Sequence, residues 1–366
     1  MRLRTCILAC ILLVSIVRPD RGYGLTTSII KGLVFADYYY GIKNHDSSLK
    51  NQNAFQFRRV YFTFENNITE NVRIRFRIES KHPKFEQSGP INPFIKHAYL
   101  EWNGLISGHK LYLGIAETNA FKNAEDYWGY RSVEATIMDL NKISSSADMG
   151  MALKGDVGRT VHHWLTVYNG TGYQNAEQDK YKKIGYAVWF TPVDGLILEG
   201  YIDYEKQDRD NAISSARDYF GASSYRTLKG FFGYRTSGFT VGAEWFRRTN
   251  KQSGSADAGG TSRTDVNKQG FSFFGSCVTP IPKIKVFARY DLYDPNTKDN
   301  VWVSDSVNGV DDETSFVFGG IDFTPNENVH FMPNIIVQNY ALEGKGSDVT
   351  VRVTLWYEFN SGKIEI

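Results

Sequence analysis

The chain has 366 residues, of which 42 are Lys or Arg and 40 are Asp or Glu, so its formal net charge is +2 at pH 7. This near balance gives no argument for a nucleic-acid partner, because nucleic-acid-binding domains carry an excess of basic groups. Beyond the N-terminal region, no run of about 18 apolar residues occurs, and this excludes a membrane-spanning helix there.

The N-terminus has the layout of a secretory signal peptide. Arg2 and Arg4 precede an apolar run from Thr5 to Val17, which is too short to span a bilayer, and a patch of small residues ends at Gly24. We predict cleavage after residues 1–24 and a single domain over residues 25–366; an uncleaved anchor is the alternative. Cleavage removes four basic residues and one acidic residue, which leaves 38 and 39 and a mature charge of about −1.

The mature chain would retain only one cysteine, Cys277, because Cys6 and Cys10 leave with the signal peptide. An exported chain with one cysteine has no internal disulfide, which excludes small disulfide-stapled modules. Aromatic residues make up 14% of the chain although its mean hydropathy is −0.37. Both values are typical of a membrane β-barrel, which is polar inside and carries aromatic girdles at its rims.

Strict alternation of apolar and polar residues predicts strands along the whole mature chain. The clearest example is Val72 to Glu79, where four apolar residues alternate with three arginines and a glutamate, a pattern that only a strand separates onto two faces. In the stretch Asn53 to Glu65, Phe55 and Phe57 are out of phase with the later residues, so we expect a β-bulge near Arg58. Further strands are predicted over Ile30–Tyr40, Ile95–Asn103, Lys110–Ala116, Met149–Leu153, Val161–Tyr168, Lys183–Phe190, Leu196–Tyr204, Tyr225–Arg235, Phe239–Arg247, Gly270–Val278, Ile284–Tyr293, Ser315–Phe323, Val329–Tyr340 and Val349–Phe359.

Short and long connections alternate between these strands. Short turns that contain Pro or Gly recur about every 44 residues, and long polar stretches lie between them. This alternation places all short turns at one end of the strands and all long loops at the other. A soluble β-sandwich also alternates apolar and polar residues, but it does not segregate loop lengths in this way. We therefore predict an all-β, antiparallel up-and-down transmembrane barrel of about sixteen strands, with short periplasmic turns and long extracellular loops.

Three stretches carry a family resemblance: AFQFRRVYFTF, PFIKHAYLEW and DYWGYRSVEATIMDL. The chain resembles the sixteen-stranded porins of Gram-negative outer membranes, and these stretches look like bacterial porins related to the phosphate-selective porin O/P group. The resemblance implies an outer-membrane location, contact with outer-membrane lipid, a homotrimer, and a third long loop that folds into the lumen. One departure is the C-terminus, where NSGKIEI follows Phe359 although such barrels usually end on an aromatic residue.

The longest connection, residues 117–147, corresponds to that third loop. Its stretch from Ser132 to Leu140 predicts a short helix with Val133, Ile137 and Leu140 roughly on one face. The connection is either an ordinary surface loop or the constriction of a pore, and its charges include Glu117, Glu125, Asp126, Arg131, Glu134 and Asp139.

If the loop constricts a pore, its carboxylates would face a basic wall on the second and third strands, formed by Arg59, Arg73, Arg75 and Arg77. Basic walls favour anions. We therefore expect a water-filled channel for passive diffusion of small hydrophilic solutes and ions, with a mild anion preference. The alternatives are a lipase-like outer-membrane enzyme and a plugged structural or adhesive barrel.

Enzymatic and metal sites have little support in the sequence. His162 and His163 are adjacent on a predicted strand, so they point to opposite faces and cannot share a metal ion. None of the serine-hydrolase, zinc-peptidase or phosphate-loop motifs occurs. Asp305, Asp311 and Asp312 lack the spacing of a calcium-binding loop. We therefore expect no catalytic residues, no cofactor and no metal.

Overall fold

The computed structural model describes residues 27–82, 91–177, 179–206, 222–252, 265–297, 313–342 and 344–365. The predicted signal peptide and Asp305, Asp311 and Asp312 lie outside these ranges. The strands are β1 (Thr27–Lys43), β2 (Asn53–Asn67), β3 (Val72–Ser80), β4 (Pro93–Asn103), β5 (His109–Glu117), β6 (Ala147–Val157), β7 (Val161–Tyr168), β8 (Lys183–Phe190), β9 (Leu196–Lys206), β10 (Ala222–Arg235), β11 (Phe239–Gln252), β12 (Val266–Val278), β13 (Ile284–Asp294), β14 (Thr314–Asn326), β15 (Val329–Tyr340), β16 (Ser347–Asn360) and the two-residue β17 (Ile364–Glu365).

Three short helical segments accompany the strands: η1 (Ser47–Leu49), α2 (Lys122–Trp128) and α3 (Ile137–Leu140). Among the described residues, no helix is long and apolar enough to cross a membrane.

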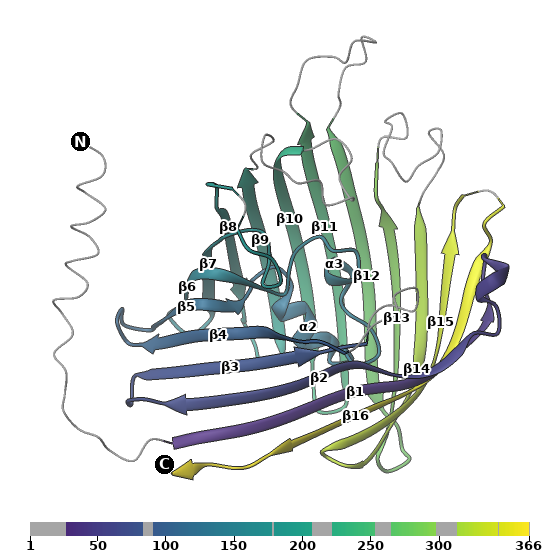
Figure 1. Cartoon of the computed structure of the whole chain (residues 1–366), viewed down its shortest axis with the longest axis horizontal. Helices are drawn as coiled ribbons and strands as arrows, with labels where there is room; N and C mark the ends of the chain where they lie inside the picture. Colours follow the sequence, from purple (N-terminus) through teal and green to yellow (C-terminus); the bar gives the residue numbers. More distant parts are fainter. Residues whose placement is uncertain are drawn as a thin grey trace, which may run out of the picture.

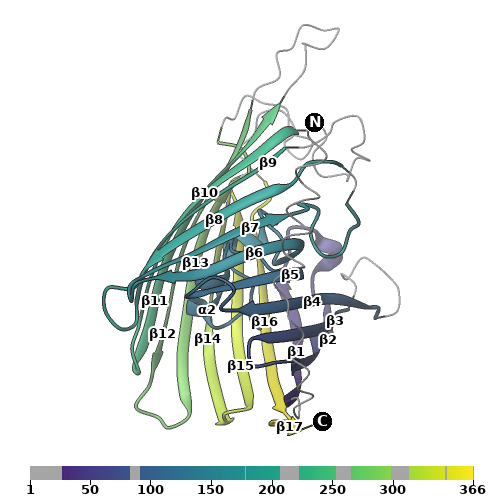
Figure 2. The same ribbon diagram turned by 90° about the vertical axis from the view of Figure 1, so that its left-hand side faces the viewer.

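The strands form a closed antiparallel barrel (Figure 1). Each strand from β1 to β15 pairs with the next one along the chain, and β16 pairs with β1, where Val34 lies opposite Tyr357. The view in Figure 2 shows the strong tilt of β4 to β8 across the wall. The prediction of an all-β barrel with sixteen long strands is confirmed.

The alternation along the strands separates an apolar outer face from an inner face that is polar on β2 to β4 and partly apolar where the wall packs against the connection between β5 and β6. On β3, Phe76 is exposed on the outer face, whereas the side chains of Arg75 and Arg77 turn inward and lie near Glu65 and Thr63 of β2. His162 and His163 also diverge: His162 approaches Thr191, and His163 contacts His109 on the outer face. Large apolar side chains are exposed around the outer face, among them Phe62, Tyr186, Phe190, Leu198, Ile202, Phe232, Phe273, Tyr290, Ile321, Phe331 and Tyr357. In a bilayer these residues would contact lipid.

Two β-bulges each add one inward-pointing cation to this pattern. Phe35 of β1 lies opposite Arg59 while Ala36 lies opposite Phe57, so Arg58 is the extra residue and the predicted bulge is confirmed. A second register shift leaves Lys96 of β4 as an extra residue. Because a bulge lets two successive side chains leave the same face, Arg58 and Lys96 enter the lumen beside their neighbours.

The C-terminal tail continues the closing strand. After Asn360 the chain bends at Gly362, whose φ is +72°. β17 then pairs with the start of β1, with Ser28 opposite Ile364, and Ser361 hydrogen-bonds to the backbone of Ile30. Residues 360–365 therefore lie along the short-turn end of the barrel beside β1.

Candidate functional site

The third loop, defined here as residues 118–146 between β5 and β6, lies inside the barrel. Figure 1 shows α2 and α3 enclosed by the wall, and Figure 2 shows α2 there from the side. α2 contacts β10 and β11, and α3 contacts β12, on the side opposite β2 to β4.

An apolar interface holds the loop against this side of the wall. Trp128 is 2% exposed and makes edge-to-face contacts with the rings of Phe274, Phe287 and Phe318, at centroid distances of 5.4, 6.2 and 5.5 Å. Such contacts combine a large buried area with favourable ring geometry. The interface further includes Ala120, Phe121, Ala124, Tyr130, Val133, Ile137, Met138 and Ile143 from the loop, and Trp164, Tyr168, Trp189, Ile197, Tyr201, Phe231, Phe246, Met332 and Ile336 from the wall.

Arg58, at the bulge of β2, anchors the side of the third loop that faces away from the apolar interface. Its guanidinium donates to the backbone carbonyls of Ser132, at 3.1 Å, and Val133, and it forms an ion pair with Glu134 at 3.0 Å. Arg352 of β16 lies 3.6 Å from the same carboxylate. The loop is thus clamped by arginines from two neighbouring regions of the wall.

The same contacts explain why the predicted helix is shorter than expected. Only Ile137–Leu140 of the predicted Ser132–Leu140 segment is helical. The carbonyls of Ser132 and Val133 accept bonds from Arg58, and that of Ala135 accepts one from Arg289 at 2.7 Å. These carbonyls bond to the wall, where a helix would pair them with amides further along the chain. Helix α2, which the sequence did not predict, lies just upstream.

The clamp keeps Glu134 ionised. Burial opposes its charged form, but the guanidiniums of Arg58 and Arg352 outweigh burial and lower the pKa of Glu134 to about 2. Within the loop, Arg131 pairs with Glu125 and, at 2.7 Å, with Asp139. Burial also opposes the charge of Asp139, and Arg131 and Arg59 outweigh it, so the pKa of Asp139 is lowered. Three of the loop carboxylates named from the sequence are therefore held by specific arginines.

The basic wall is neutralised mainly by carboxylates of neighbouring strands. Arg59 pairs with Glu79 at 2.8 Å, Arg75 pairs with Glu65 at 3.4 Å, and Arg73 pairs with Glu101. Arg77 differs: its Nε donates to Thr63 Oγ1 at 2.7 Å and its guanidinium lies over the Tyr61 ring, 5.1 Å from the centroid. Among the described residues it forms no ion pair with a carboxylate.

A cavity of about 270 Å³ lies between this wall and the loop. Its lining includes four basic side chains, from Arg77, Lys96, Lys122 and Arg131, and three acidic ones, from Glu117, Glu125 and Asp126. The ring nitrogens of His97, which also lines it, are buried and have no hydrogen-bond partner in the described part of the chain. We call this space the upper cavity.

Sequence reasoning missed several residues of this site. Arg58, Lys96, Arg289 and Arg352 all bind the loop or line the space beside it. The adjacent polar pairs Arg58-Arg59 and Lys96-His97 were a usable signal, because two successive inward side chains require a bulge. Of the predicted wall, Arg59, Arg75 and Arg77 lie near the loop, whereas Arg73 pairs with Glu101 close to the short-turn end. No group of three or more potential metal ligands occurs among the described residues.

Comparison with solved structures shows other proteins with this architecture. The outer membrane channel DcaP of Acinetobacter baumannii superposes with a TM-score of 0.64 at 11% identity, covering 94% of this chain and 100% of that one. An anion-selective porin from Comamonas acidovorans gives 0.62 at 12% identity, covering 91% and 100%. The fold is that of the sixteen-stranded porins. The trimer form of OmpT from Vibrio cholerae gives 0.57 at 10% identity, covering 92% and 100%.

No protein-family model matches the sequence, and the search of curated proteins finds no match. At identities of 10–12% the structural likeness shows the porin fold alone, and it does not extend to the O/P group.

Proposed function

We propose that this porin-fold barrel is a water-filled outer-membrane channel for passive diffusion of small hydrophilic solutes and ions, with a mild preference for anions. The observation that carries the proposal is the upper cavity between the third loop and the wall of β1 to β4. The loop packs its apolar side against the opposite wall and leaves charged groups along this space. Charged, hydrated linings pass polar solutes and exclude apolar ones.

The mild anion preference follows from the charges along the path. Four basic groups oppose three acidic ones in the lining, and Arg77 has no carboxylate partner among the described residues. A small local excess of positive charge raises the concentration of anions without excluding cations. The resemblance of three sequence stretches to the O/P group makes phosphate one of the anions to be tested.

Location and assembly form part of the same proposal. The exposed apolar outer face suits an outer-membrane barrel, and solved structures with this fold include a trimer form of OmpT. We propose a bacterial outer membrane location and a homotrimer, which native mass spectrometry in detergent would test.

Single-channel recording separates the channel from its two alternatives. Purified protein in a planar bilayer should produce discrete conductance steps in KCl. A plugged structural barrel would give none, and that result would refute the proposal. A lipase-like barrel would release fatty acid from phospholipid micelles, which we do not expect.

Replacing Arg77 with Ala should reduce the anion preference. One unit charge acts on an ion 4 to 8 Å away in water with on the order of 0.5–1 kcal/mol, so the local concentration of anions should fall roughly two- to fivefold, and the anion-to-cation permeability ratio should fall with it. The reversal potential under a KCl gradient measures this ratio. Arg247→Ala is the matched control. Arg247 is exposed on the outer face of β11, whereas its neighbour Phe246 faces the lumen. Cation selectivity in the wild type, or equal ratios in both variants, would contradict the anion preference.

A further inference from the structure

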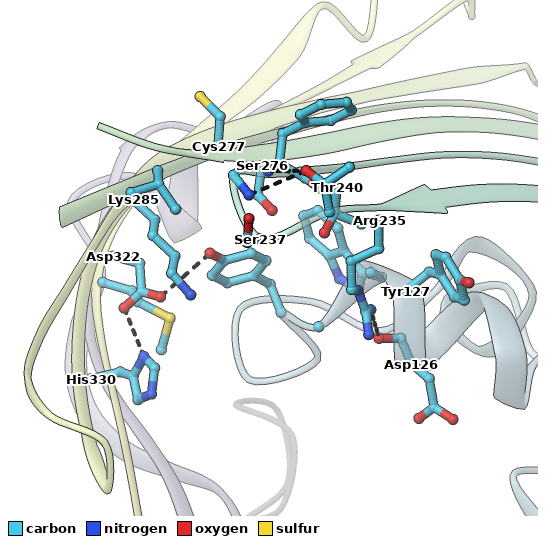
Figure 3. A pocket seen from close by; sticks show the side chains of 18 of the residues that line it. Asp126, Tyr127, Arg235, Ser237, Thr240, Ser276, Cys277, Lys285, Asp322 and His330 are labelled. Atoms are coloured by element: carbon cyan, nitrogen blue, oxygen red, sulfur yellow. Dashed lines mark hydrogen bonds and ion pairs between the residues drawn. The ribbon is translucent and has the colours of Figure 1, made fainter. Parts of the chain in front are cut away.

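A second cavity, of about 380 Å³, lies beyond the third loop toward the short-turn end of the lumen (Figure 3). Residues 126–132 of the loop form one side, and the ends of β10 to β16 form the other. Asp126 and Gly129 line both this lower cavity and the upper cavity. The two spaces therefore adjoin at the C-terminal end of α2, so a solute that passes the upper cavity meets the lower one.

Two cations of the lower cavity form no ion pair with a carboxylate of the described residues. The Arg235 guanidinium lies over the Tyr127 ring, 4.6 Å from its centroid, and donates to the backbone carbonyl of Asp126. Lys285 is exposed to the cavity, and among the described residues its ammonium forms no hydrogen bond or ion pair. Both groups therefore keep donors available for a solute.

The carboxylates at the border of the cavity are already engaged. Asp322 forms a hydrogen bond with His330 Nδ1 at 2.8 Å and accepts one from the Tyr130 hydroxyl at 3.4 Å (Figure 3). The carboxylate of Asp126 pairs with Lys122. Asp322 lies opposite Lys285 in the register of β13 and β14, but among the described residues neither carboxylate forms an ion pair with Arg235 or Lys285.

The remaining lining combines hydroxyl groups with aromatic rings. Ser237, Thr240 and Ser276 supply hydroxyls, and the rings of Trp356 and Tyr130 supply apolar surface. Cys277 points out of the cavity in Figure 3, so its thiol takes no part. The volume lies within the roughly 300–1,000 Å³ of pockets that hold small molecules.

We propose that the lower cavity is a binding subsite for small organic oxyanions, in which Lys285 and Arg235 bind a carboxylate or phosphate group and the aromatic rings contact an apolar body. This inference rests on the proposed channel function. The subsite would hold such solutes briefly after they pass the third loop. It would thus favour them over neutral solutes of equal size.

Single-channel recording with benzoate, phenyl phosphate and neutral benzyl alcohol tests the subsite. Both oxyanions should cause transient blockades of the KCl current, and benzyl alcohol should cause none. Because one charge contact at 4 Å in water is worth about 1 kcal/mol, Lys285→Ala should shorten the blockades roughly fivefold. The longer blockade of the two identifies the preferred anionic group.

Lys363→Ala is the matched control, because Lys363 is exposed at the same end of the barrel and does not line the cavity. It should leave the blockades unchanged. Arg235→Lys keeps the charge but loses the planar contact with Tyr127, and should shorten the blockades less than Lys285→Ala. If conductance steps appear but the oxyanions cause no blockades, or Lys285→Ala leaves them unchanged, the subsite is refuted while the channel stands. Absence of conductance steps refutes the channel itself.

Discussion

Trp128→Ala is expected to release the third loop from the wall while the barrel stays folded. The substitution removes a fully buried indole that contacts Phe274, Phe287 and Phe318 and donates its Nε1 hydrogen to the carbonyl of Glu134 at 2.9 Å. Truncation of a buried tryptophan costs about 3–5 kcal/mol of packing. That cost falls on the docking of the loop, because the hydrogen bonds between strands do not involve Trp128.

Two measurements report this release. Single-channel current noise should rise as the loop samples positions away from the wall, and trypsin should cleave after Arg131, whose side chain is only 13% exposed in the wild type. Heat-dependent electrophoretic mobility shows that the barrel itself remains folded. Trp245→Ala is the matched control, because Trp245 lies on the same strand as Phe246 but on the outer face. A quiet, trypsin-resistant Trp128→Ala channel would show that the apolar interface does not hold the loop.

Arg58→Ala should make the loop sensitive to acid. In the wild type the pKa of Glu134, about 2, lies below its usual value near 4.5. A lowered pKa means that the clamp is at full strength above about pH 4.5 and is lost only as the pH falls through about 2. The wild-type current should therefore show no change in noise between pH 7 and about pH 4.5.

Without Arg58, Arg352 is the one ion-pair partner of Glu134 left among the described residues, and the loss of a buried ion-pair partner costs on the order of 3 kcal/mol. The pKa of Glu134 should rise, so noise should appear as the pH is lowered toward 4.5. Arg73→Ala removes another lumen arginine, one that pairs with Glu101 on the wall, and should remain quiet over the same range. Equal acid sensitivity of both variants would mean that the Arg58 clamp has no special role in loop docking.

The sequence predicted the barrel well because lipid on one face and water on the other impose a period of two on every strand. The Val72–Glu79 segment has the predicted orientation, with the Phe76 side chain on the outer face and the arginine side chains on the inner face. The bulge at Arg58 was visible as a phase shift between Phe57 and Val60. These features depend on neighbours along the chain.

The site is formed by contacts between residues far apart in the sequence, which no local sequence pattern predicts. The helix predicted to start at Ser132 is shortened because the carbonyls of Ser132, Val133 and Ala135 bond to Arg58 and Arg289, 74 to 154 residues away. The pairing of Arg131 with Glu125 and Asp139 likewise follows from how the loop folds back on itself. Sequence alone indicated which charges the loop carries but not which of them would neutralise one another.

The two bulges show how a one-residue insertion can change the charge of a barrel lumen. Inserting one residue into a strand normally reverses the direction of every side chain beyond it, which in a membrane barrel would turn charges toward lipid. At Arg58 and Lys96 the extra residue is absorbed locally, so Phe55 and Phe57 stay on the same face as Phe62, and Ile95 stays on the same face as Leu100. A one-codon insertion at such a position adds a cation to the interior and leaves the membrane-facing surface as it was.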